Sequence, residues 1–358
     1  MHANPRSVLA SGFVALDVVR SDQGVWMCAG GTAGNVAANL AYFGWKARIA
    51  GSIGRDDAGR IVSRDLFDAG VDTSALYQHD EVGTPLVLHE IDGKSHRFKF
   101  GCSVCGRLYH RYRPLATTEV SKLLNCERLA DVFFFDRPGA AALALAETHA
   151  KAGRLVVYEP STAGNAGTHR RAAACADVIK FSEEQAAKFE KYFPEDPPNH
   201  QLRIVTRGDK GARFRLGPGA WREQPAHSIS VVDAGGAGDW MTAALLDSLE
   251  LHRPWQVAEV EEAVRWAQSV AAISCLVPGA RLLASILESG ALRQQVKELL
   301  SEGPPKAFEP TLRGIRRTSK RCERCRLPFM ASREGRRRPS HPIRPKPNNC
   351  TIMGNKPC

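Results

Sequence analysis

A short glycine-rich segment in the second half of the chain has the composition of a phosphate-binding turn. Residues 231–239 read VVDAGGAGD, and the apolar-periodic stretch WMTAALLDSL follows them. The two valines predict the end of a buried strand, and the small residues predict a tight turn into a helix. The backbone N–H groups of Gly236, Ala237 and Gly238 would then lie uncovered at the positive end of that helix, where they can stabilise a phosphoryl group in transfer.

Asp239 belongs to the same turn, and a carboxylate there repels a resting phosphate. A general base that takes the proton from an attacking hydroxyl explains its presence. Taken alone, the segment has a second interpretation, namely an ordinary glycine turn with an aspartate that suits the dipole of the first helical turn. The candidate catalytic set is therefore Asp239 with the three amides.

A second motif lies near the N-terminus. Gly30 and Gly31 precede Asn35 and an alanine-rich helix expected over about 36–43, and a strand is expected over 47–51. This segment and DAGGAGD resemble the two signatures of the PfkB (ribokinase-like) carbohydrate kinase family. Both occur in the family's order and at its separation, and the resemblance extends over about residues 7–305.

The resemblance implies a three-layer α/β fold in which a mostly parallel sheet carries helices on both faces and a small β-sheet lid closes over a sugar. It also implies transfer of the γ-phosphoryl group of ATP to a sugar hydroxyl, with Mg²⁺ bridging the β and γ oxygens. Asp17, Gly31 and Asn35 fall where the family binds its sugar, beside Asp239. From the residues alone, Asp17 could instead be a turn residue and Asn35 a helix cap.

The nucleotide side of the resemblance contains a departure. Thr206 and Gly208 lie in the segment that resembles the family's strand and turn beside ATP, and Lys180 matches the first position of its Lys-x-Asn-x-x-Glu element. Here Ser182 replaces the asparagine and Gln185 replaces the glutamate that helps to place magnesium. Neutral glutamine binds a hard cation less well, and Glu183 or Glu184 could substitute after a small shift.

Three further positions bear on the binding of substrate or a cation. Ala234 replaces the usual threonine, which removes one hydroxyl. In relatives, backbone carbonyls near Asp233 and in the loop matched by residues 266–281 hold a monovalent cation such as K⁺, and this sequence permits the same. Asp136 and Arg137 end a strand-like run, where Arg137 could meet an anionic group of the substrate or be a surface arginine.

The body of the chain alternates apolar strand-like runs with alanine-rich helical stretches, which predicts a mostly parallel sheet between helices. The expected strands are 8–14, 47–51, 132–135, 155–158, 178–180 and 202–206. Residues 17–27 and 84–100 break the alternation and predict antiparallel strands with a hairpin turn at Asp92-Gly93. The absence of a GxxxxGK[ST] sequence argues against a P-loop.

Charge divides the chain into two parts. The sequence has 358 residues, 43% hydrophobic, and a formal net charge of +11. Residues 310–358 contain 14 Lys and Arg against two Glu, which leaves 35 basic and 36 acidic residues elsewhere. We therefore expect a kinase domain over 1–309, with lid strands within 15–30 and 84–112, and a basic extension over 310–358. Such a tail attracts nucleic acid or acidic partners without sequence specificity, but a solvated, disordered extension is the interpretation we favour.

The ten cysteines include two C-x-x-C pairs, Cys102 with Cys105 and Cys322 with Cys325. Two such turns can together form a four-thiolate zinc site. A redox pair, partnership of the second pair with Cys350 and Cys358, and unpaired thiols are the alternatives.

The segment 7–19 is interrupted by Asp17 and predicts a first strand rather than a signal peptide, and no apolar run reaches the ~20 residues of a membrane span. We therefore expect a cytoplasmic enzyme that binds a small sugar and ATP, with a homodimer through the lid sheets as in relatives. Two other functions stay open. One is a nucleoside kinase of the same family, and the other is a weakened kinase that binds a ligand and acts through its tail.

Overall fold

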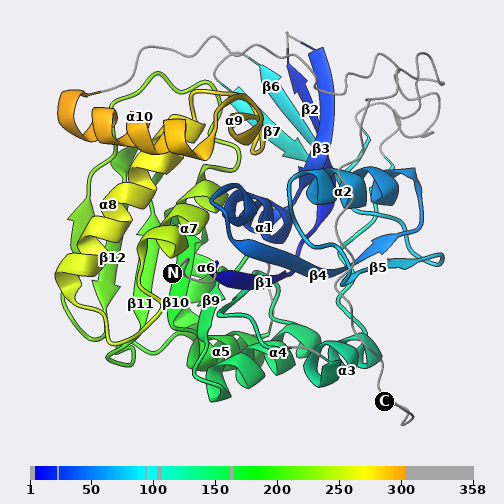
Figure 1. Cartoon of the computed structure of the whole chain (residues 1–358), viewed down its shortest axis with the longest axis horizontal. Coiled ribbons are helices and arrows are strands. Elements are labelled where there is room, and N and C mark those ends of the chain that lie inside the picture. The colour runs from blue at the N-terminus through cyan, green and yellow to red at the C-terminus, as the bar shows by residue number, and fades with distance from the viewer. Residues whose placement is uncertain are drawn as a thin grey trace.

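The computed structural model describes residues 5–21, 24–92, 95–102, 107–126, 128–161 and 165–303. Its main sheet is built from β1 (Ser7–Ser11), β4 (Lys46–Gly54), β5 (Leu76–His79), β8 (Val132–Phe135), β9 (Leu155–Tyr158), β10 (Val178–Ser182), β11 (Leu202–Thr206), β12 (Ala212–Leu216) and β13 (Arg222–Gln224). In the described chain these nine strands have the order β13-β12-β11-β10-β9-β8-β1-β4-β5 (Figure 1).

The sheet is parallel from β11 to β5, and only β12 and β13 run antiparallel at one edge. Its central strands are continuous apolar runs, because helices cover both faces and each side chain is buried. The four residues of β8, VFFF, are all fully buried. The predicted α/β architecture with a mostly parallel sheet is confirmed.

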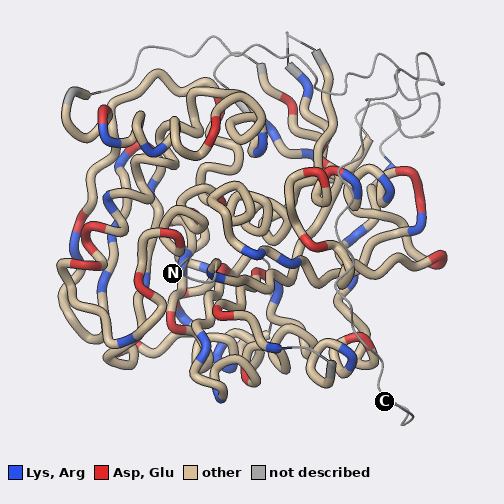
Figure 2. The backbone as a smooth tube through the Cα atoms, in the orientation of Figure 1, with Lys and Arg blue, Asp and Glu red and all other residues tan. Residues whose placement is uncertain are grey.

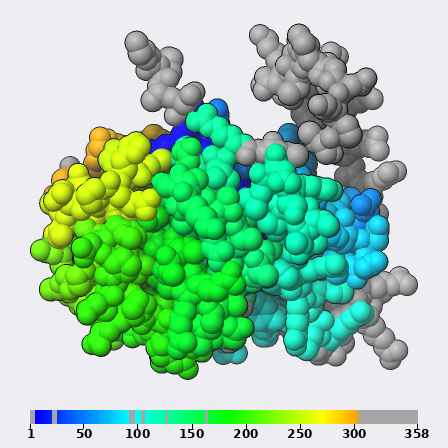
Figure 3. Space-filling view, turned by 90° about the horizontal axis from the view of Figure 1, so that it is seen from below, coloured from blue at the N-terminus to red at the C-terminus, as the bar shows by residue number. Residues whose placement is uncertain are grey.

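Helices lie on both faces of this sheet. They are α1 (Thr32–Tyr42), α2 (Asp57–Asp68), α3 (Thr117–Cys126), α4 (Ala140–Lys151), α5 (Ala166–Cys175), α6 (Glu183–Phe189), α7 (Ala237–Ser248), α8 (Val257–Ser274), α9 (Leu282–Ile286) and α10 (Ser289–Glu302). One hydrophobic core joins the sheet to α1, α7, α8 and α10, and the other joins it to α3, α4 and α5. Figure 3 shows the molecule from below, the side on which α3, α4 and α5 lie in Figure 1.

A separate four-stranded sheet forms the expected lid. It contains β2 (Ala15–Ser21), β3 (Gly24–Gly30), β6 (Leu86–Asp92) and β7 (Ser95–Lys99), in the order β3-β2-β6-β7. The hairpin partners β2–β3 and β6–β7 are antiparallel, as predicted, whereas β2 and β6 are parallel. Leu16, Val18, Leu86 and Leu88 anchor one face of this sheet in the main core. Figure 1 shows the lid beside α2 and α9.

The approach to α7 differs from the prediction. Val231 and Val232 were expected to end a buried strand, but they lie in an irregular segment after β13 and are 53% and 46% exposed. Two backbone hydrogen bonds, from Val232 N and Asp233 N to the carbonyl of Cys275, hold this segment. The expectation was wrong because these two residues bond to the end of α8 rather than to a strand, and β-branched residues also suit an extended connection.

Charges are mixed over the described chain. Figure 2 shows basic and acidic residues interspersed along it, in agreement with the near-zero balance outside the tail. None of the described helices is long and apolar enough to cross a membrane. The tail beyond residue 303 lies outside the described residues, so the boundary between kinase domain and extension stays a prediction.

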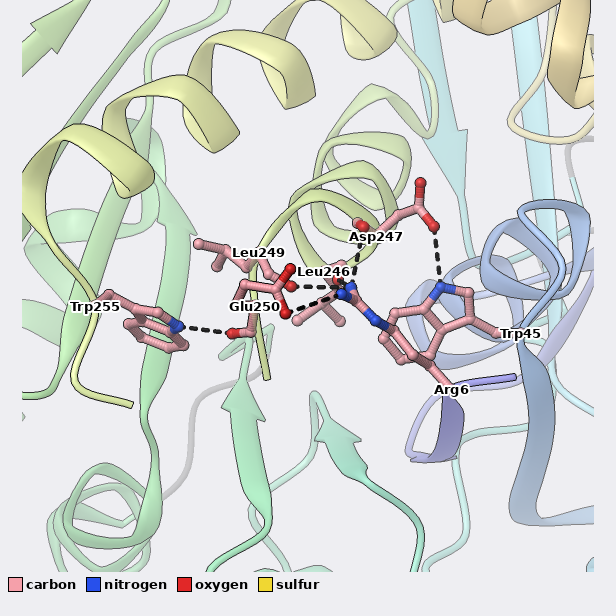
Figure 4. Close-up of polar contacts among 7 residues, drawn as sticks. All are labelled: Arg6, Trp45, Leu246, Asp247, Leu249, Glu250 and Trp255. Carbon is pink, nitrogen blue, oxygen red and sulfur yellow. Dashed lines mark hydrogen bonds and ion pairs between the residues drawn. The ribbon is translucent and has the colours of Figure 1, made fainter. Parts of the chain in front are cut away.

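The residues directly before β1 and β4, Arg6 and Trp45, contact the C-terminal end of α7 (Figure 4). Arg6 Nη1 donates to the carbonyl oxygens of Leu246, Asp247 and Leu249 at 3.3, 3.1 and 2.9 Å. The Asp247 side chain in turn accepts from Trp45 Nε1 at 3.1 Å. A cation at this end of a helix satisfies carbonyls that have no partner within the helix and complements the helix dipole. Arg6 therefore fixes the helix whose other end begins at Gly236.

Replacing Arg6 should destabilise the whole domain. We expect Arg6→Ala to lower the free energy of unfolding by about 2 kcal/mol, because several carbonyls lose a charged donor in one step. Urea denaturation measures the change. Arg64→Ala is the matched control, since Arg64 pairs with Asp68 on an exposed helix face and should cost less than about 0.5 kcal/mol. Equal losses in the two variants would contradict the role given to Arg6.

Candidate active site

The turn before α7 requires glycine and leaves two amides available. Gly236 has φ 83°, and a Cβ there would lie 2.3 Å from Cβ of Ala280. Ala237 N donates to the carbonyl of Ala234 at 3.2 Å, so the expectation that three amides lie uncovered is wrong for Ala237. This bond closes the turn itself. The amides of Gly236 and Gly238 have no hydrogen-bond partner within the described chain, and they form the remaining anion-binding pair.

Asp239 lies in the first turn of α7 and is partly buried. Its Oδ2 accepts a hydrogen bond of 2.7 Å from Asn35 Nδ2, which comes from α1. Burial, and then the neighbouring carboxylate of Glu159, raise the pKa of Asp239 well above its ordinary value. The structure thus brings together two residues that the sequence places in separate motifs, and Asn35 Oδ1 lies buried without a hydrogen bond to the described residues.

Sequence reasoning did not identify Glu159. This residue directly follows β9, and its Oε1 lies 2.5 Å from Nζ of Lys180 on the next strand. Its Oε2 accepts from the hydroxyl of Thr242 at 2.8 Å, one turn beyond Asp239. A Cβ on Gly238 would lie 3.6 Å from Lys180 Nζ and 4.0 Å from Glu159 Oε1. The sequence did offer one indication of this residue. Glu159 is a carboxylate directly after a buried parallel strand, and ligands bind at the carboxyl ends of such strands.

Asp136 occupies the corresponding place after β8 and organises the neighbouring loop. Its Oδ1 accepts from the backbone N–H of Phe13 and its Oδ2 accepts from the hydroxyl of Ser161, each at 2.8 Å. A Cβ on Gly12 would lie 1.6 Å from Asp136 Oδ1, so that position also requires glycine. Burial raises the pKa of Asp136, although the adjacent Arg137 opposes the shift. Strand ends β8, β9 and β10 therefore supply a row of charged groups beside Asp239.

The predicted sugar residues of the lid side lie around the start of α1. Gly31 has φ 81°, and a Cβ there would lie 2.4 Å from the carbonyl oxygen of Phe13. Asp17 lies on β2, where burial raises its pKa to about 7 and the charge of Arg281 partly opposes that rise. No hydrogen bond or ion pair joins Asp17 to Asn35 or Asp239 within the described chain.

The loop after α8 meets the turn before α7 through Asp233. Its carboxylate accepts from Gly279 N at 2.7 Å and from Gly235 N at 2.8 Å. His89 of the lid places Nε2 3.5 Å from Asp233 Oδ1. These contacts hold together the two segments whose carbonyls were expected to bind a monovalent cation, and they connect both to the lid.

The predicted nucleotide residues lie further along the same edge. Thr206 ends β11, and Gly208, with φ 57°, begins a short turn to Lys210. The alternative magnesium residue Glu183 lies 3.8 Å from Lys210 Nζ and is half exposed. Glu159, rather than Glu183, is the carboxylate that contacts Lys180 beside Asp239.

The zinc hypothesis falls largely outside the described chain, because of its four cysteines only Cys102 is described. Cys105, Cys322 and Cys325 lie in segments that the structure does not describe. Among the described residues no group of three or more His, Cys, Asp or Glu is arranged to hold a metal ion. The two C-x-x-C pairs stay a prediction.

Comparison with known proteins agrees with this geometry. The sequence profile described as pfkB family carbohydrate kinase matches residues 7–286. A fructokinase of Vibrio alginolyticus is 26% identical over 304 residues, covering 76% of this chain and 94% of the relative.

Two solved structures share the fold. The aminoimidazole riboside kinase of Salmonella enterica, complexed with aminoimidazole riboside and an ATP analogue, superposes with a TM-score of 0.61 at 23% identity, covering 83% of this chain and all of that one. A fructokinase double mutant of Vibrio cholerae O395, bound to fructose, ADP and potassium, gives 0.63 at 22% identity, covering 81% and 97%.

The fold and the site define a kinase of the ribokinase-like class, with a lidded α/β domain and a glycine turn at a helix start. The chain belongs to the pfkB family of carbohydrate kinases, enzymes that phosphorylate sugars with ATP. The family expected from the two motifs is confirmed.

The raised pKa of Asp239 gives a stability test of the site's electrostatics. Because its pKa is raised in the folded protein, the folded state binds its proton more tightly than the unfolded chain does. Stability contributed by this group is therefore lost as pH rises from the unfolded pKa toward the folded one. Asn cannot ionise, so Asp239→Asn avoids that loss.

We expect Asp239→Asn to be more stable than the wild type by about 1–3 kcal/mol at pH 9, with a smaller difference at pH 5. Urea denaturation at the two pH values provides the comparison. A difference that is independent of pH, or that grows toward acidic pH, would show that the carboxylate is not held in a raised-pKa environment.

Proposed function

We propose that this enzyme transfers the γ-phosphoryl group of ATP to a hydroxyl of a sugar or sugar-like acceptor, with Asp239 as the general base. The observation that carries the proposal is the place of this carboxylate, partly buried at the start of α7 and held by Asn35 beside two available amides. A carboxylate with a raised pKa accepts a proton more readily, which suits removal of the hydroxyl proton during attack. Asn35 fixes the side chain that receives it.

The amides of Gly236 and Gly238 would stabilise the charge of the transferring group, together with the positive end of α7. Lys180 lies near Gly238 and is 3% exposed, so its ammonium can contact a phosphate oxygen without competition from bulk water. Glu159 holds that ammonium in place and is fixed by Thr242. The phosphoryl group therefore meets two backbone donors and one oriented cation.

Magnesium fits this donor set. Mg²⁺ takes oxygen ligands, keeps several waters and commonly uses one or two carboxylates with substrate phosphates, and Glu159 would be such a carboxylate. A full protein cage is not required. Bound Mg²⁺ would neutralise charge on the β and γ oxygens. Thr206 and Gly208 are the proposed ATP contacts, and carbonyls beside Asp233 are proposed to hold K⁺.

The acceptor is proposed to lie between Asp17 of the lid, Gly31 and Asn35. Short polar groups at these places can donate to or accept from vicinal hydroxyls. Related structures contain fructose and aminoimidazole riboside, so a sugar and a nucleoside-like acceptor are both compatible with this fold. We propose a sugar derivative, because the charged groups at the strand ends β8, β9 and β10 suit a hydroxylated ligand.

Loss of the base should remove turnover. We expect Asp239→Asn to lower kcat for ATP-dependent phosphorylation by about 10²–10⁴-fold with a much smaller effect on KM for ATP, since proton removal occurs in the transition state. A coupled ADP assay over hexoses, pentoses, sugar acids and nucleosides measures it. Asp196→Asn, on the exposed surface, is the matched control.

In the wild type, kcat/KM should increase with pH as Asp239 loses its proton. Ligand binding without turnover in the wild type, or full activity in Asp239→Asn, would reject the kinase mechanism in favour of a ligand-binding protein.

A further inference from the structure

Arg137 stands in the active site and is not used by the mechanism above. It follows Asp136 at the carboxyl end of β8, and its side chain is only 15% exposed. Its guanidinium carbon lies 4.7 Å from the ring centre of Phe13 and 5.6 Å from that of Tyr112. Contacts with two aromatic rings hold the planar group in place and lower the entropy it loses on binding a ligand.

The position of Arg137 is tied to the proposed sugar site by its neighbours. Phe13 accepts a hydrogen bond from Ala33 N through its carbonyl, and that carbonyl lies where a side chain on Gly31 would be. Phe13, in the connection between β1 and β2, therefore contacts the start of α1, the helix that carries Asn35. On the other side, Asp136 influences the charge state of Asp239. Arg137 thus lies between Phe13, which contacts the start of α1, and Asp136, which lies near Asp239.

The guanidinium of Arg137 has N–H donors without hydrogen-bond partners in the described chain. Its Nε is buried and lies 3.2 Å from Asp136 Oδ2 as an ion pair, but it makes no hydrogen bond within the described chain. The two terminal nitrogens likewise have no hydrogen-bond partner among the described residues. An arginine presents its donors as a planar fork that matches the paired oxygens of a carboxylate or phosphate.

The charged neighbours of Arg137 leave its terminal nitrogens available to an added anion. Lys180 is paired with Glu159 at 2.5 Å, so that cation is already matched. Asp136 is the nearest acid to Arg137, but it also accepts from Phe13 and Ser161, and burial raises its pKa. The Asp136 carboxylate compensates the charge of Arg137, but it lies beside Nε only, so the two terminal nitrogens of this largely buried side chain stay available to an anionic group of the substrate.

We propose that Arg137 is a specificity-determining residue whose guanidinium binds a carboxylate or phosphate group of the acceptor. The preferred substrate is then an acidic sugar derivative rather than a neutral sugar. This inference rests on the proposed function, because it names the substrate class of the same site. The alternative is a purely structural arginine that serves as the counter-ion of Asp136.

Matched acceptor pairs test the proposal with the full-length protein. Glucose is compared with gluconate and glucuronate, and ribose with ribose 1-phosphate. The first comparison tests recognition of a carboxylate, and the second tests recognition of a phosphate. We expect kcat/KM of the wild type to be at least about tenfold higher for the acidic member of one pair. Arg137→Met should raise KM for that acid by about 10- to 100-fold and leave KM for ATP unchanged.

Two further variants distinguish binding from structure. Arg137→Lys keeps the charge but loses the fork, so its KM for the acid should lie between those of the wild type and Arg137→Met. Arg171→Met is the matched control, because Arg171 is 59% exposed on α5 and pairs with Glu147. Far-UV circular dichroism and thermal unfolding verify that each variant is folded.

The proposal is overturned if the wild type does not prefer an acid, or if Arg137→Met lowers kcat/KM equally for the neutral and acidic members. Calorimetric titration separates this result from failure of the kinase mechanism. If no acceptor is phosphorylated, binding of the acid that is lost in Arg137→Met still supports the role of Arg137. Equal binding of the acid to both proteins, or to neither, rejects it.

Discussion

The hydrogen bond between Asn35 and Asp239 is the contact on which the site depends. It joins α1 to α7, two helices that carry separate motifs, and its partners are 204 residues apart in the chain. Removing a carboxylate from water is costly unless its oxygens accept hydrogen bonds, and Asn35 supplies one such donor to the partly buried Asp239. At the start of the same helix, Gly236 leaves no room for a Cβ beside Ala280.

The C-terminal end of α7 is held by a positively charged side chain, in contrast to the carboxylate at its N-terminal end. Arg6 satisfies the last carbonyls of α7, and Asp247 receives donors from Trp45 and Arg293. The carboxylate of Asp239, whose pKa burial raises, lowers stability once it is ionised, whereas the contacts of Arg6 with the last carbonyls raise it. A destabilising and a stabilising group thus lie at the two ends of one helix.

Parallel strands supply the rest of the charged groups. Because β8, β9 and β10 run parallel and side by side, Asp136 after β8, Glu159 after β9 and Lys180 within β10 lie near one another. A carboxylate, that of Glu159, thus lies beside Lys180 although Gln185 stands on α6 at the position of the family's glutamate.

The local sequence was sufficient for the two motifs, for the strands at 132–135, 155–158 and 202–206, and for the lid hairpins, since periodicity and turn chemistry depend on neighbouring residues. It was misleading for Val231 and Val232, whose β-branched side chains suit an exposed connection as well as a strand. Only the tertiary structure brought Glu159 into an ion pair with Lys180 and brought Arg137 into contact with the rings of Phe13 and Tyr112. Those partners come from distant segments, and their charge states depend on burial that packing of the whole sheet creates.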